Sequence, residues 1–406
     1  MNRSELIVVG GGASGMMAAL TAAERGVKVL LIESDERLGR KIKQSGNGRC
    51  NFTNLSLTLE RYHGSEPDFA SYALNDFNNR DTIDFFRKLG VLTRTEEDRV
   101  YPLSNSSGSI LDALRYALNE RGVKIVAPER IQTAEKSGKH FILQGASGES
   151  YMSEYLIVAT GGLAGLKSGA ESSYEILESF GHRRTKLYPS ICKIAVDSRL
   201  PRALKGVKAE AELKLLRGEE IIAQREGELL FWEGGISGPV SFDISRAVSE
   251  YGLSNLAVSI DFFVGFSHDE LFKFFKKRIA YMPGLDAGEL FTGSLQNRLG
   301  RMLIREKGIH SSKKLSEISD AELKEIIACA KDFRAGVLRL DSLSNAQVTA
   351  GGIKTADFNS ETMESKLIKN LFACGEVLDI DGDCGGYNLQ WAWSSGRLAG
   401  KLGKKE

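Results

Sequence analysis

Three glycines near the N-terminus have the spacing that a dinucleotide-binding loop requires. Gly10, Gly12 and Gly15 fit the pattern G-x-G-x-x-G and enclose Ala13 and Ser14. The first glycine permits a tight turn, the second lets the backbone approach a pyrophosphate, and the third lets a helix pack closely on a strand. The positive end of the following helix attracts phosphate groups. The loop therefore predicts a dinucleotide site.

The segments around this loop have the order of a βαβ unit. Residues 5–9 are a short apolar run with β-branched side chains, which predicts a buried strand. Residues 16–25 predict a helix that Gly26 ends, and residues 27–32 predict a second strand. Glu33 follows that strand, near the position of the acid that binds a ribose. The plain alternative is a solvated carboxylate at a strand end.

A glycine-rich, cationic loop after Glu33 bears on the choice of cofactor. A nicotinamide dehydrogenase would continue with further βα units, whereas residues 39–51 form a long loop that can wrap the second half of an extended dinucleotide. The candidate contacts in this loop are Arg40, Lys41, Gly48, Arg49 and Cys50. The loop favours FAD.

Later segments predict a β-meander and two further cofactor loops. Strands are expected at residues 123–126, 130–134 and 140–143, with a turn at 137–138, and the meander is expected to return to a parallel strand at residues 155–158. The loops are expected at Thr160, Gly161 and Gly162, and at Gly375 and Glu376 after a strand over residues 371–374. Gly386, Asn388 and Leu389 lie where a last helix begins. Taken alone, the glycines before that helix also fit an ordinary turn.

At these residues the chain resembles the two-dinucleotide-binding-domain flavoproteins. Within that group it is similar to the bacterial NAD(P)/FAD-dependent oxidoreductase family that includes aminoacetone oxidase and a bile-acid-reducing flavoprotein. The similarity covers nearly the whole chain, with GRKIKQSGNGRCNFTN at 39–54, ATGG at 159–162, GELLFWEGGISGP at 227–239 and GEVLDIDGDCGGYNLQWAWSSGRLAG at 375–400. One departure lies at residues 171–174, where ESSY replaces a turn of the T-G-D-G type.

The resemblance implies roles along the cofactor. Glu33 would bind the adenosine ribose, Ile131 would meet adenine through its backbone, and Glu376 would bind the ribityl chain. Residues 160–162 would lie beside the pyrophosphate. The helix that begins near Asn388 would point its positive end at the flavin pyrimidine ring, where negative charge appears on reduction.

The order of segments predicts an α/β protein with an interrupted cofactor domain. We expect a Rossmann-like FAD-binding domain with a β-meander at residues 1–187 and 334–406, and an insert domain at residues 188–333. Alternating residues at 209–215 and 229–232 predict a small β-barrel or sandwich in the insert. Amphipathic patterns then predict helices at 269–279, 289–305 and 320–330.

Composition limits the compartment and the partners. Hydrophobic residues make up 42% and charged residues 26% of the chain, without an apolar run long enough to span a bilayer. The N-terminus lacks the pattern of a secretory signal, so we expect a cytoplasmic protein that does not enter membranes. Five scattered cysteines without a C-x-x-C pair predict neither disulfides nor a metal site. The net charge of +1 argues against a nucleic-acid partner.

The expected function is FAD-dependent oxidoreduction of a small molecule. The reaction is either oxidation of an amine or reduction of an activated C=C bond, with NAD(P)H as a possible transient reductant. The alternatives are an FAD-dependent nucleic-acid-modifying protein and a flavin-binding protein without turnover. Candidate side chains for chemistry lie in the motif segments, but no motif designates a catalytic residue: Arg49, Tyr101, His182, Cys384 and Tyr387.

Overall fold

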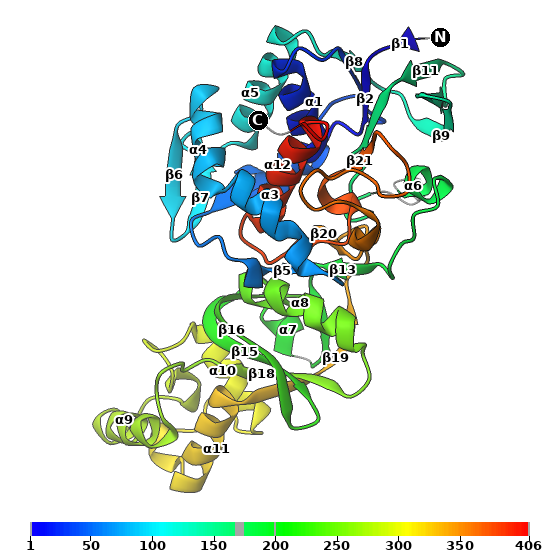
Figure 1. Cartoon of the computed structure of the whole chain (residues 1–406). Helices are drawn as coiled ribbons and strands as arrows, with labels where there is room; N and C mark the ends of the chain where they lie inside the picture. Colours follow the sequence, from blue (N-terminus) through cyan, green and yellow to red (C-terminus); the bar gives the residue numbers. More distant parts are fainter. Residues whose placement is uncertain (1, 167–173, 199, 405–406) are drawn as a thin grey trace. The chain divides into compact units, whose positions relative to one another are not determined.

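The computed structural model describes residues 2–166, 174–198 and 200–404. Contacts within the chain divide it into two compact units. Unit 1 comprises residues 1–188 and 343–406, and unit 2 comprises residues 189–342. Each unit has its own core of buried apolar side chains. In Figure 1 the blue N-terminal and red C-terminal segments both belong to unit 1, so the two ends of the chain build one domain.

A five-stranded parallel sheet is the centre of unit 1. Its strands are, in order, β21 (Leu371–Ala373), β12 (Tyr155–Val158), β2 (Leu6–Val9), β3 (Val29–Ile32) and β8 (Lys124–Val126). Every residue of β2 and β3 is buried, as expected for strands covered on both faces. The predicted Rossmann-like arrangement is confirmed, with the C-terminal strand β21 beside β12.

Two helices pack closely together in this unit because glycines remove the side chains between them. Helix α1 (Ala13–Glu24) follows β2, and α12 (Tyr387–Gly400) lies against it. A Cβ atom on Gly396 would come within 2.4 Å of the Ser14 carbonyl oxygen, and one on Gly400 within 2.5 Å of the Ala18 carbonyl oxygen. The close approach brings the C-terminal motif to the first glycine loop.

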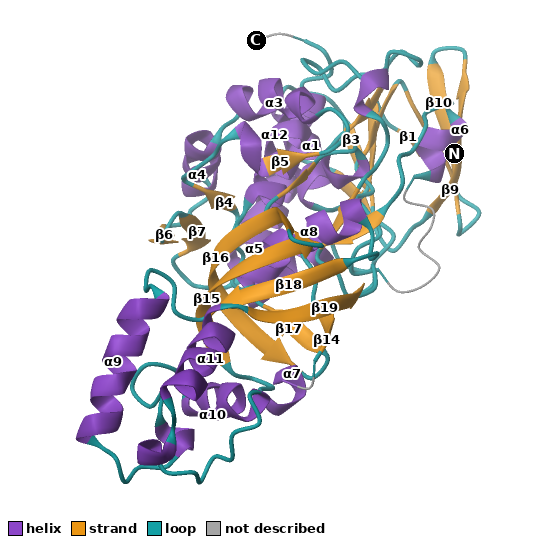
Figure 2. Ribbon diagram, turned by 90° about the horizontal axis from the view of Figure 1, so that it is seen from below, coloured by secondary structure: helices purple, strands orange, loops and turns teal. Residues whose placement is uncertain are grey.

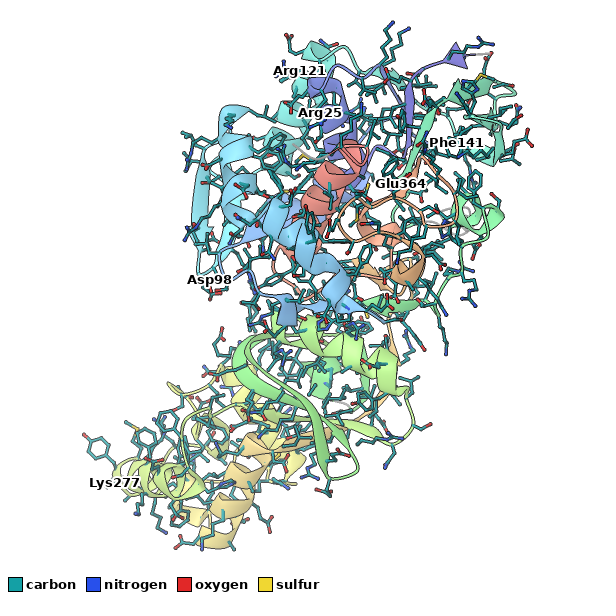
Figure 3. All side chains as sticks on the ribbon, in the orientation of Figure 1. Arg25, Asp98, Arg121, Phe141, Lys277 and Glu364 are labelled. Carbon is teal, nitrogen blue, oxygen red and sulfur yellow. The ribbon has the colours of Figure 1, made fainter. Side chains whose placement is uncertain are left out.

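The second sheet of unit 1 has the order β1 (Asn2–Arg3), β11 (Ser150–Ser153), β10 (His140–Gly145) and β9 (Ile131–Ser137). It contains the strands expected at 130–134 and 140–143, together with β1 and β11, which were not expected, while the strands expected at 123–126 and 155–158 are β8 and β12 of the parallel sheet. Strands β9, β10 and β11 are antiparallel neighbours. Phe141 of β10, labelled in Figure 3, is fully buried. Its ring meets that of Phe180 edge-on.

Shorter elements complete unit 1. Strand β7 (Arg99–Pro102) pairs with β4 (Thr53–Asn54) and β6 (Thr93–Glu96), and β5 (Tyr62–His63) pairs with β22 (Asp381–Gly382). The remaining strands are β13 (Tyr188–Ser190), which spans the boundary between the units, and β20 (Val348–Ala350). The other helices are α2 (Arg40–Gln44), α3 (Ala70–Asp76), α4 (Asn79–Lys88), α5 (Ser107–Glu120) and α6 (Glu175–Ser179).

Unit 2 contains a closed antiparallel barrel (Figure 2). Around the barrel the strands are β14 (Ile194–Asp197), β17 (Gly235–Ser237), β16 (Glu220–Trp232), β15 (Lys208–Arg217), β18 (Leu256–Asp261) and β19 (Phe333–Leu340). Strand β19 closes the barrel by pairing with both β14 and β18. The unit therefore continues to residue 342, beyond the boundary expected at 333, because the last barrel strand begins there.

The helices of unit 2 lie between strands of the barrel in the sequence. They are α7 (Leu200–Ala203), α8 (Pro239–Tyr251), α9 (His268–Tyr281), α10 (Asn297–Glu306) and α11 (Asp320–Lys331). The helix expected over residues 289–305 is wrong in its first part, since α10 begins only at Asn297. Gly293 has a φ of +89°, which turns the chain out of a helical path. Within the described residues, none of the helices has the length and apolar character needed to cross a membrane.

Candidate cofactor site

The first glycine loop presents a free helix N-terminus. Gly12 caps α1 without a side-chain hydrogen bond, and the first turn of α1 carries no acidic residue. A Cβ atom on Gly12 would meet nothing within 4 Å, whereas one on Gly15 would lie 1.8 Å from the Gly10 carbonyl oxygen. Gly10 has a φ of +108° and packs against Ala159. The loop is tight where it meets the sheet and open at the helix N-terminus, which suits a pyrophosphate.

Glu33 is held against this loop by its carboxylate. Its Oε2 accepts a hydrogen bond from the Gly11 N–H at 2.6 Å, and its Oε1 accepts one from the Asp35 N–H at 2.8 Å. The carboxylate thus lies beside the glycine loop at the end of β3, as the ribose assignment requires. Arg40 forms an ion pair with Asp35 at 3.2 Å between Nε and Oδ2.

Four segments that are far apart in the sequence converge at Lys41. Its Nζ donates to Glu376 Oε2 at 2.7 Å and to the Gly162 carbonyl at 3.5 Å. The other oxygen of Glu376 accepts the Thr349 N–H at 2.8 Å. A Cβ atom on Gly162 would lie 2.5 Å from Thr349 Oγ1, so only glycine fits there. The loops at 39–51, 160–162 and 375–376 therefore meet, together with Thr349, a residue that the sequence did not single out.

Ser14 and Gly375 join the first loop to the C-terminal motif. The Ser14 hydroxyl donates to the Cys374 carbonyl at 3.4 Å. A Cβ atom on Gly375 would lie 2.4 Å from Ser14 Oγ, so the two segments are in direct contact.

The cationic loop is a tightly wound turn. Gly46, Asn47, Gly48 and Cys50 all have φ between +55° and +83°. Cys50 is fully buried, and burial raises the pKa of its thiol to about 12. The Arg49 guanidinium donates to Glu96, which lowers the pKa of that carboxyl, and lies 4.3 Å from the centre of the Tyr101 ring. The side chain of Arg49 thus holds the loop to the β6–β7 hairpin.

A buried, unpaired acceptor lies at the N-terminus of α12, where Gly386 packs closely on the Thr53 backbone. Gly386 caps the helix in a left-handed conformation without a side-chain hydrogen bond. Asn51 Oδ1 is buried and has no hydrogen-bond partner among the described residues, and a Cβ atom on Gly386 would lie 2.9 Å from it. The Asn388 side chain instead binds its own loop, accepting from the Gly382 N–H and donating to the Gly382 carbonyl. Leu389 is half-buried against the core.

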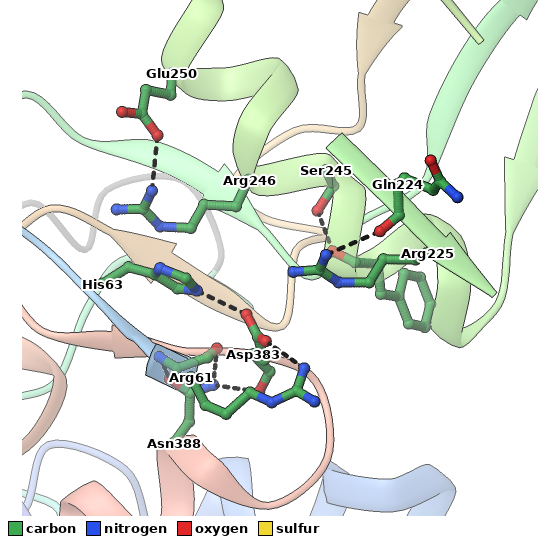
Figure 4. Close-up of polar contacts among 11 residues, drawn as sticks. Arg61, His63, Gln224, Arg225, Ser245, Arg246, Glu250, Asp383 and Asn388 are labelled. Atoms are coloured by element: carbon green, nitrogen blue, oxygen red, sulfur yellow. Dashed lines mark hydrogen bonds and ion pairs between the residues drawn. The ribbon is translucent and has the colours of Figure 1, made fainter. Parts of the chain in front are cut away.

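A histidine on β5 and a carboxylate that follows β22, both missed by the sequence reasoning, lie side by side (Figure 4). Strands β5 and β22 pair His63 with Asp381, and His63 Nε2 lies 2.6 Å from Asp383 Oδ1. Arg61 Nη1 donates to the other oxygen of Asp383 at 3.1 Å. The Asp383 side chain is 5% exposed and that of His63 is 27% exposed. No short motif marks such a pair, because the two residues are distant in the sequence.

The other candidates for chemistry have structural surroundings. His182 is buried, stacks on Phe358 with 4.5 Å between ring centres, and lies 3.0 Å from Ser365 Oγ; burial lowers its pKa. The Tyr387 hydroxyl donates to the Ser56 carbonyl. Tyr101 is buried beneath Arg49, and Cys384 is partly exposed.

Two further expectations from the sequence concern Ile131 and residues 171–173. Ile131 is buried at the start of β9, and its contact with adenine stays a prediction. Residues 171–173 of the departing turn lie outside the described part of the chain.

Comparison with known proteins identifies the family. Residues 4–402 match the family described as the HI0933-like protein Rossmann domain. The chain belongs to this family. It is 33% identical, over 99% of its length and 98% of the relative, to a protein of Clostridium scindens named 3-dehydro-bile acid delta(4,6)-reductase. It is 32% identical, over 97% and 96%, to a ribosomal RNA dihydrouridine synthase of Haemophilus influenzae.

A solved structure shows the same fold at lower identity. The 3-ketosteroid delta1-dehydrogenase of Sterolibacterium denitrificans aligns over 99% of both chains with a TM-score of 0.51 and 12% identity. Family membership makes the chain an FAD-dependent oxidoreductase with a Rossmann-type cofactor domain.

The residues present fit FAD. The space at Gly12 admits a pyrophosphate, and the Asn51 Oδ1 acceptor beside the N-terminus of α12 can receive a ring N–H. Glu33 and Glu376 carry carboxylates, the group that accepts hydrogen bonds from ribose and ribityl hydroxyls. All of these groups belong to unit 1.

Proposed function

We propose that this protein reduces a carbon–carbon double bond conjugated to a carbonyl group in a small molecule, with NAD(P)H as a transient electron donor. The observation that supports this reaction is the 33% identity, over 99% of the chain, to the protein named as a bile acid reductase. Amine oxidation is the competing reaction within the same class. Cysteines without disulfides are typical of a reducing compartment, which supports action in the cytoplasm.

Different residues of the chain would bind different parts of FAD. The N-terminus of α1 would hold the pyrophosphate, and Glu33 the adenosine ribose. Lys41 would fix Glu376 for the ribityl chain through the 2.7 Å ion pair. When bound, FAD supplies the hydride chemistry, and the positive end of α12 favours the charge that reduction brings to the pyrimidine ring.

His63 is the candidate proton donor for this reaction. Addition of a hydride to one carbon of the double bond requires a proton at the other carbon, and histidine most often performs such transfers. His63 is partly exposed, while the buried carboxylate of Asp383 fixes its ring orientation. The product then contains both added hydrogens, and NAD(P)H leaves as NAD(P)⁺.

Anaerobic stopped-flow measurements separate the two half-reactions. Reduction of the flavin by NADPH, followed by reoxidation with a steroid 4-en-3-one, would support the proposal. Flavin reduction by an amine without reoxidation by the enone would favour amine oxidation. If neither NADPH nor an amine reduces the flavin, a protein without turnover is favoured.

Replacement of His63 tests its role within the same experiment. We expect His63→Gln to slow reoxidation by the enone by about a hundredfold or more, the usual contribution of general acid catalysis, and to leave reduction by NADPH unchanged. Equal rates for parent and variant in the enone step would show that His63 does not supply the proton. His140→Gln, which replaces an exposed histidine on β10 of the same unit, is the matched control.

A uridine in ribosomal RNA is the second candidate substrate. The 32% identity to the protein named as a ribosomal RNA dihydrouridine synthase supports it, and the uracil ring also contains a double bond conjugated to a carbonyl. Incubation of the reduced enzyme with unmodified ribosomal RNA, followed by nuclease digestion and mass spectrometry, tests this candidate. A uridine that gains two hydrogens would favour RNA over the small molecule.

A further inference from the structure

A cationic hollow lies on unit 1 apart from the residues assigned to FAD. It is a shallow hollow of ≈ 630 Å³ that is open to solvent, and it is lined by four cationic side chains, those of Arg183, Arg184, Lys186 and Lys354, with Glu178 as the one carboxylate in its lining. Pockets of this size accept a nucleotide-sized ligand. The surplus of positive charge indicates an anionic ligand.

The floor of the hollow is fixed by backbone hydrogen bonds between two segments. The Thr185 N–H donates to the Gly352 carbonyl at 2.9 Å, and the Lys354 N–H donates to the Arg183 carbonyl at 2.9 Å. Gly352 N–H also donates to Thr185 Oγ1 at 3.0 Å. The cations therefore project from a paired, two-segment platform rather than from a single loop.

Two of the four cationic side chains contact a carboxylate or an aromatic ring, and the other two form no ion pair with a described carboxylate. Arg184 pairs with Glu178 at 3.3 Å and lies 5.1 Å from the centre of the Tyr174 ring. Lys186 lies over the ring of Tyr188 at 4.9 Å. Neither Arg183 nor Lys354 has a carboxylate within 4.0 Å among the described residues. These two cations are the natural direct ligands of an anion.

The platform adjoins the candidate cofactor site through the backbone. Ile353, between Gly352 and Lys354, donates its N–H to the Val377 carbonyl at 2.8 Å. Val377 directly follows Glu376, the proposed ribityl ligand. The platform is thus hydrogen-bonded directly to the segment that follows the cofactor motif.

We propose that this hollow binds phosphate groups of a nucleotide ligand through Arg183 and Lys354. Arginine matches phosphate geometry with paired donors, and lysine binds phosphate as a point charge. The phosphates come either from the dinucleotide that donates electrons or from the backbone of an RNA chain. Binding at the hollow does not depend on which compound the enzyme reduces.

Charge reversal in the holoenzyme tests the proposal. The variants are Arg183→Glu and Lys354→Glu, and the matched control is Lys139→Glu, an exposed lysine in the turn between β9 and β10 of the same unit. Anisotropy of a labelled RNA oligonucleotide is measured at several salt concentrations. The rate of flavin reduction is measured against the concentrations of NADPH and of NADH, which differ only in the 2′-phosphate.

We expect Arg183→Glu and Lys354→Glu to weaken the binding of one phosphate ligand by about tenfold or more, which corresponds to the loss of one charge-assisted hydrogen bond. The Lys139→Glu control is expected to change binding little. Weaker RNA binding with a shallower salt dependence identifies an RNA backbone. A higher NADPH requirement with unchanged NADH identifies the 2′-phosphate, and an equal rise for both identifies the pyrophosphate.

Unchanged binding of all three ligands relative to Lys139→Glu would overturn the proposal. Flavin content and circular dichroism show whether each variant is folded, and Arg183→Gln and Lys354→Gln replace any variant that is not. Because RNA binding is measured without turnover, a failure of enone reduction leaves this test intact.

Discussion

At the scale of single residues, Gly12 and Gly15 of the first loop have opposite surroundings. An added methyl group at Gly15 would collide with the Gly10 carbonyl oxygen at 1.8 Å, whereas at Gly12 it would point into open space. The φ of Gly12 is −77°, which alanine adopts without strain. Gly15 is therefore required by the fold, whereas a side chain at Gly12 is expected to affect only the bound cofactor.

We expect Gly12→Ala to fold normally and to bind FAD more weakly by about 1–3 kcal/mol, because the methyl group would occupy the space in which the backbone approaches a pyrophosphate. Titration of the apoprotein with FAD measures the change. Gly284→Ala is the control, since a Cβ atom there also meets nothing within 4 Å but lies in unit 2. Equal affinities for the two variants would place the pyrophosphate elsewhere.

The cysteines allow a second test at this scale. Burial raises the pKa of Cys50 and of Cys374 to about 12 and that of Cys192 to about 11. A thiol with a raised pKa stays protonated at pH 8 and is then a poor nucleophile. We expect iodoacetamide at pH 8 to label Cys384, the partly exposed cysteine, before the other four. Peptide mapping that finds Cys50 or Cys374 modified first in folded protein would contradict this.

At the scale of elements, the contact between α1 and α12 joins the two ends of the chain. Gly396 lies in the interior of α12, where alanine would ordinarily stabilise a helix by about 1 kcal/mol. Its Cβ atom, however, would approach the Ser14 carbonyl oxygen to 2.4 Å, and that oxygen belongs to backbone that cannot rotate away. The steric cost therefore outweighs the gain in helix propensity.

We expect Gly396→Ala to destabilise the protein by about 1–3 kcal/mol, the usual cost of overpacking, as measured by urea unfolding. Gly108→Ala, in the first turn of α5, is the helical control, because its nearest neighbour is the capping side chain of Ser106 at 3.3 Å and not backbone. The control is expected to be neutral or slightly stabilising. A Gly396→Ala variant as stable as the control would show that α1 and α12 separate at little cost.

At the scale of the whole molecule, the two units have separate cores. The apolar cluster of unit 1 is built from residues on both sides of the insert, and that of unit 2 only from residues 194–340. All groups assigned to FAD lie in unit 1, so we propose that unit 2 contributes little to cofactor affinity.

Replacement of residues 189–342 by a glycine-serine linker tests this division. We expect FAD to bind within about 1.4 kcal/mol of the parent, a tenfold change in affinity. Circular dichroism of the deletion protein checks that unit 1 is folded. A folded deletion protein that takes up no flavin would mean that the insert completes the cofactor site.

The cofactor loop could be predicted from the sequence because its chemistry is local. Gly10, Gly12, Gly15 and Glu33 lie within one βαβ unit, where a strand, a turn and a helix must follow each other in space. The hairpin of β9 and β10 was predictable for the same reason, since its two strands follow each other in the sequence. Local patterns and short connections leave few arrangements open.

Contacts between distant segments were decided only by the tertiary structure. Lys41 and Glu376 are brought together because β21 pairs with β12 and α12 packs on α1, and no spacing rule relates two residues so far apart. The same holds for His63 and Asp383, and for β19, whose place in the barrel depends on pairing with β14. The sequence by itself determined which residues have the chemistry for a dinucleotide, and the packing of its elements decided which of them meet.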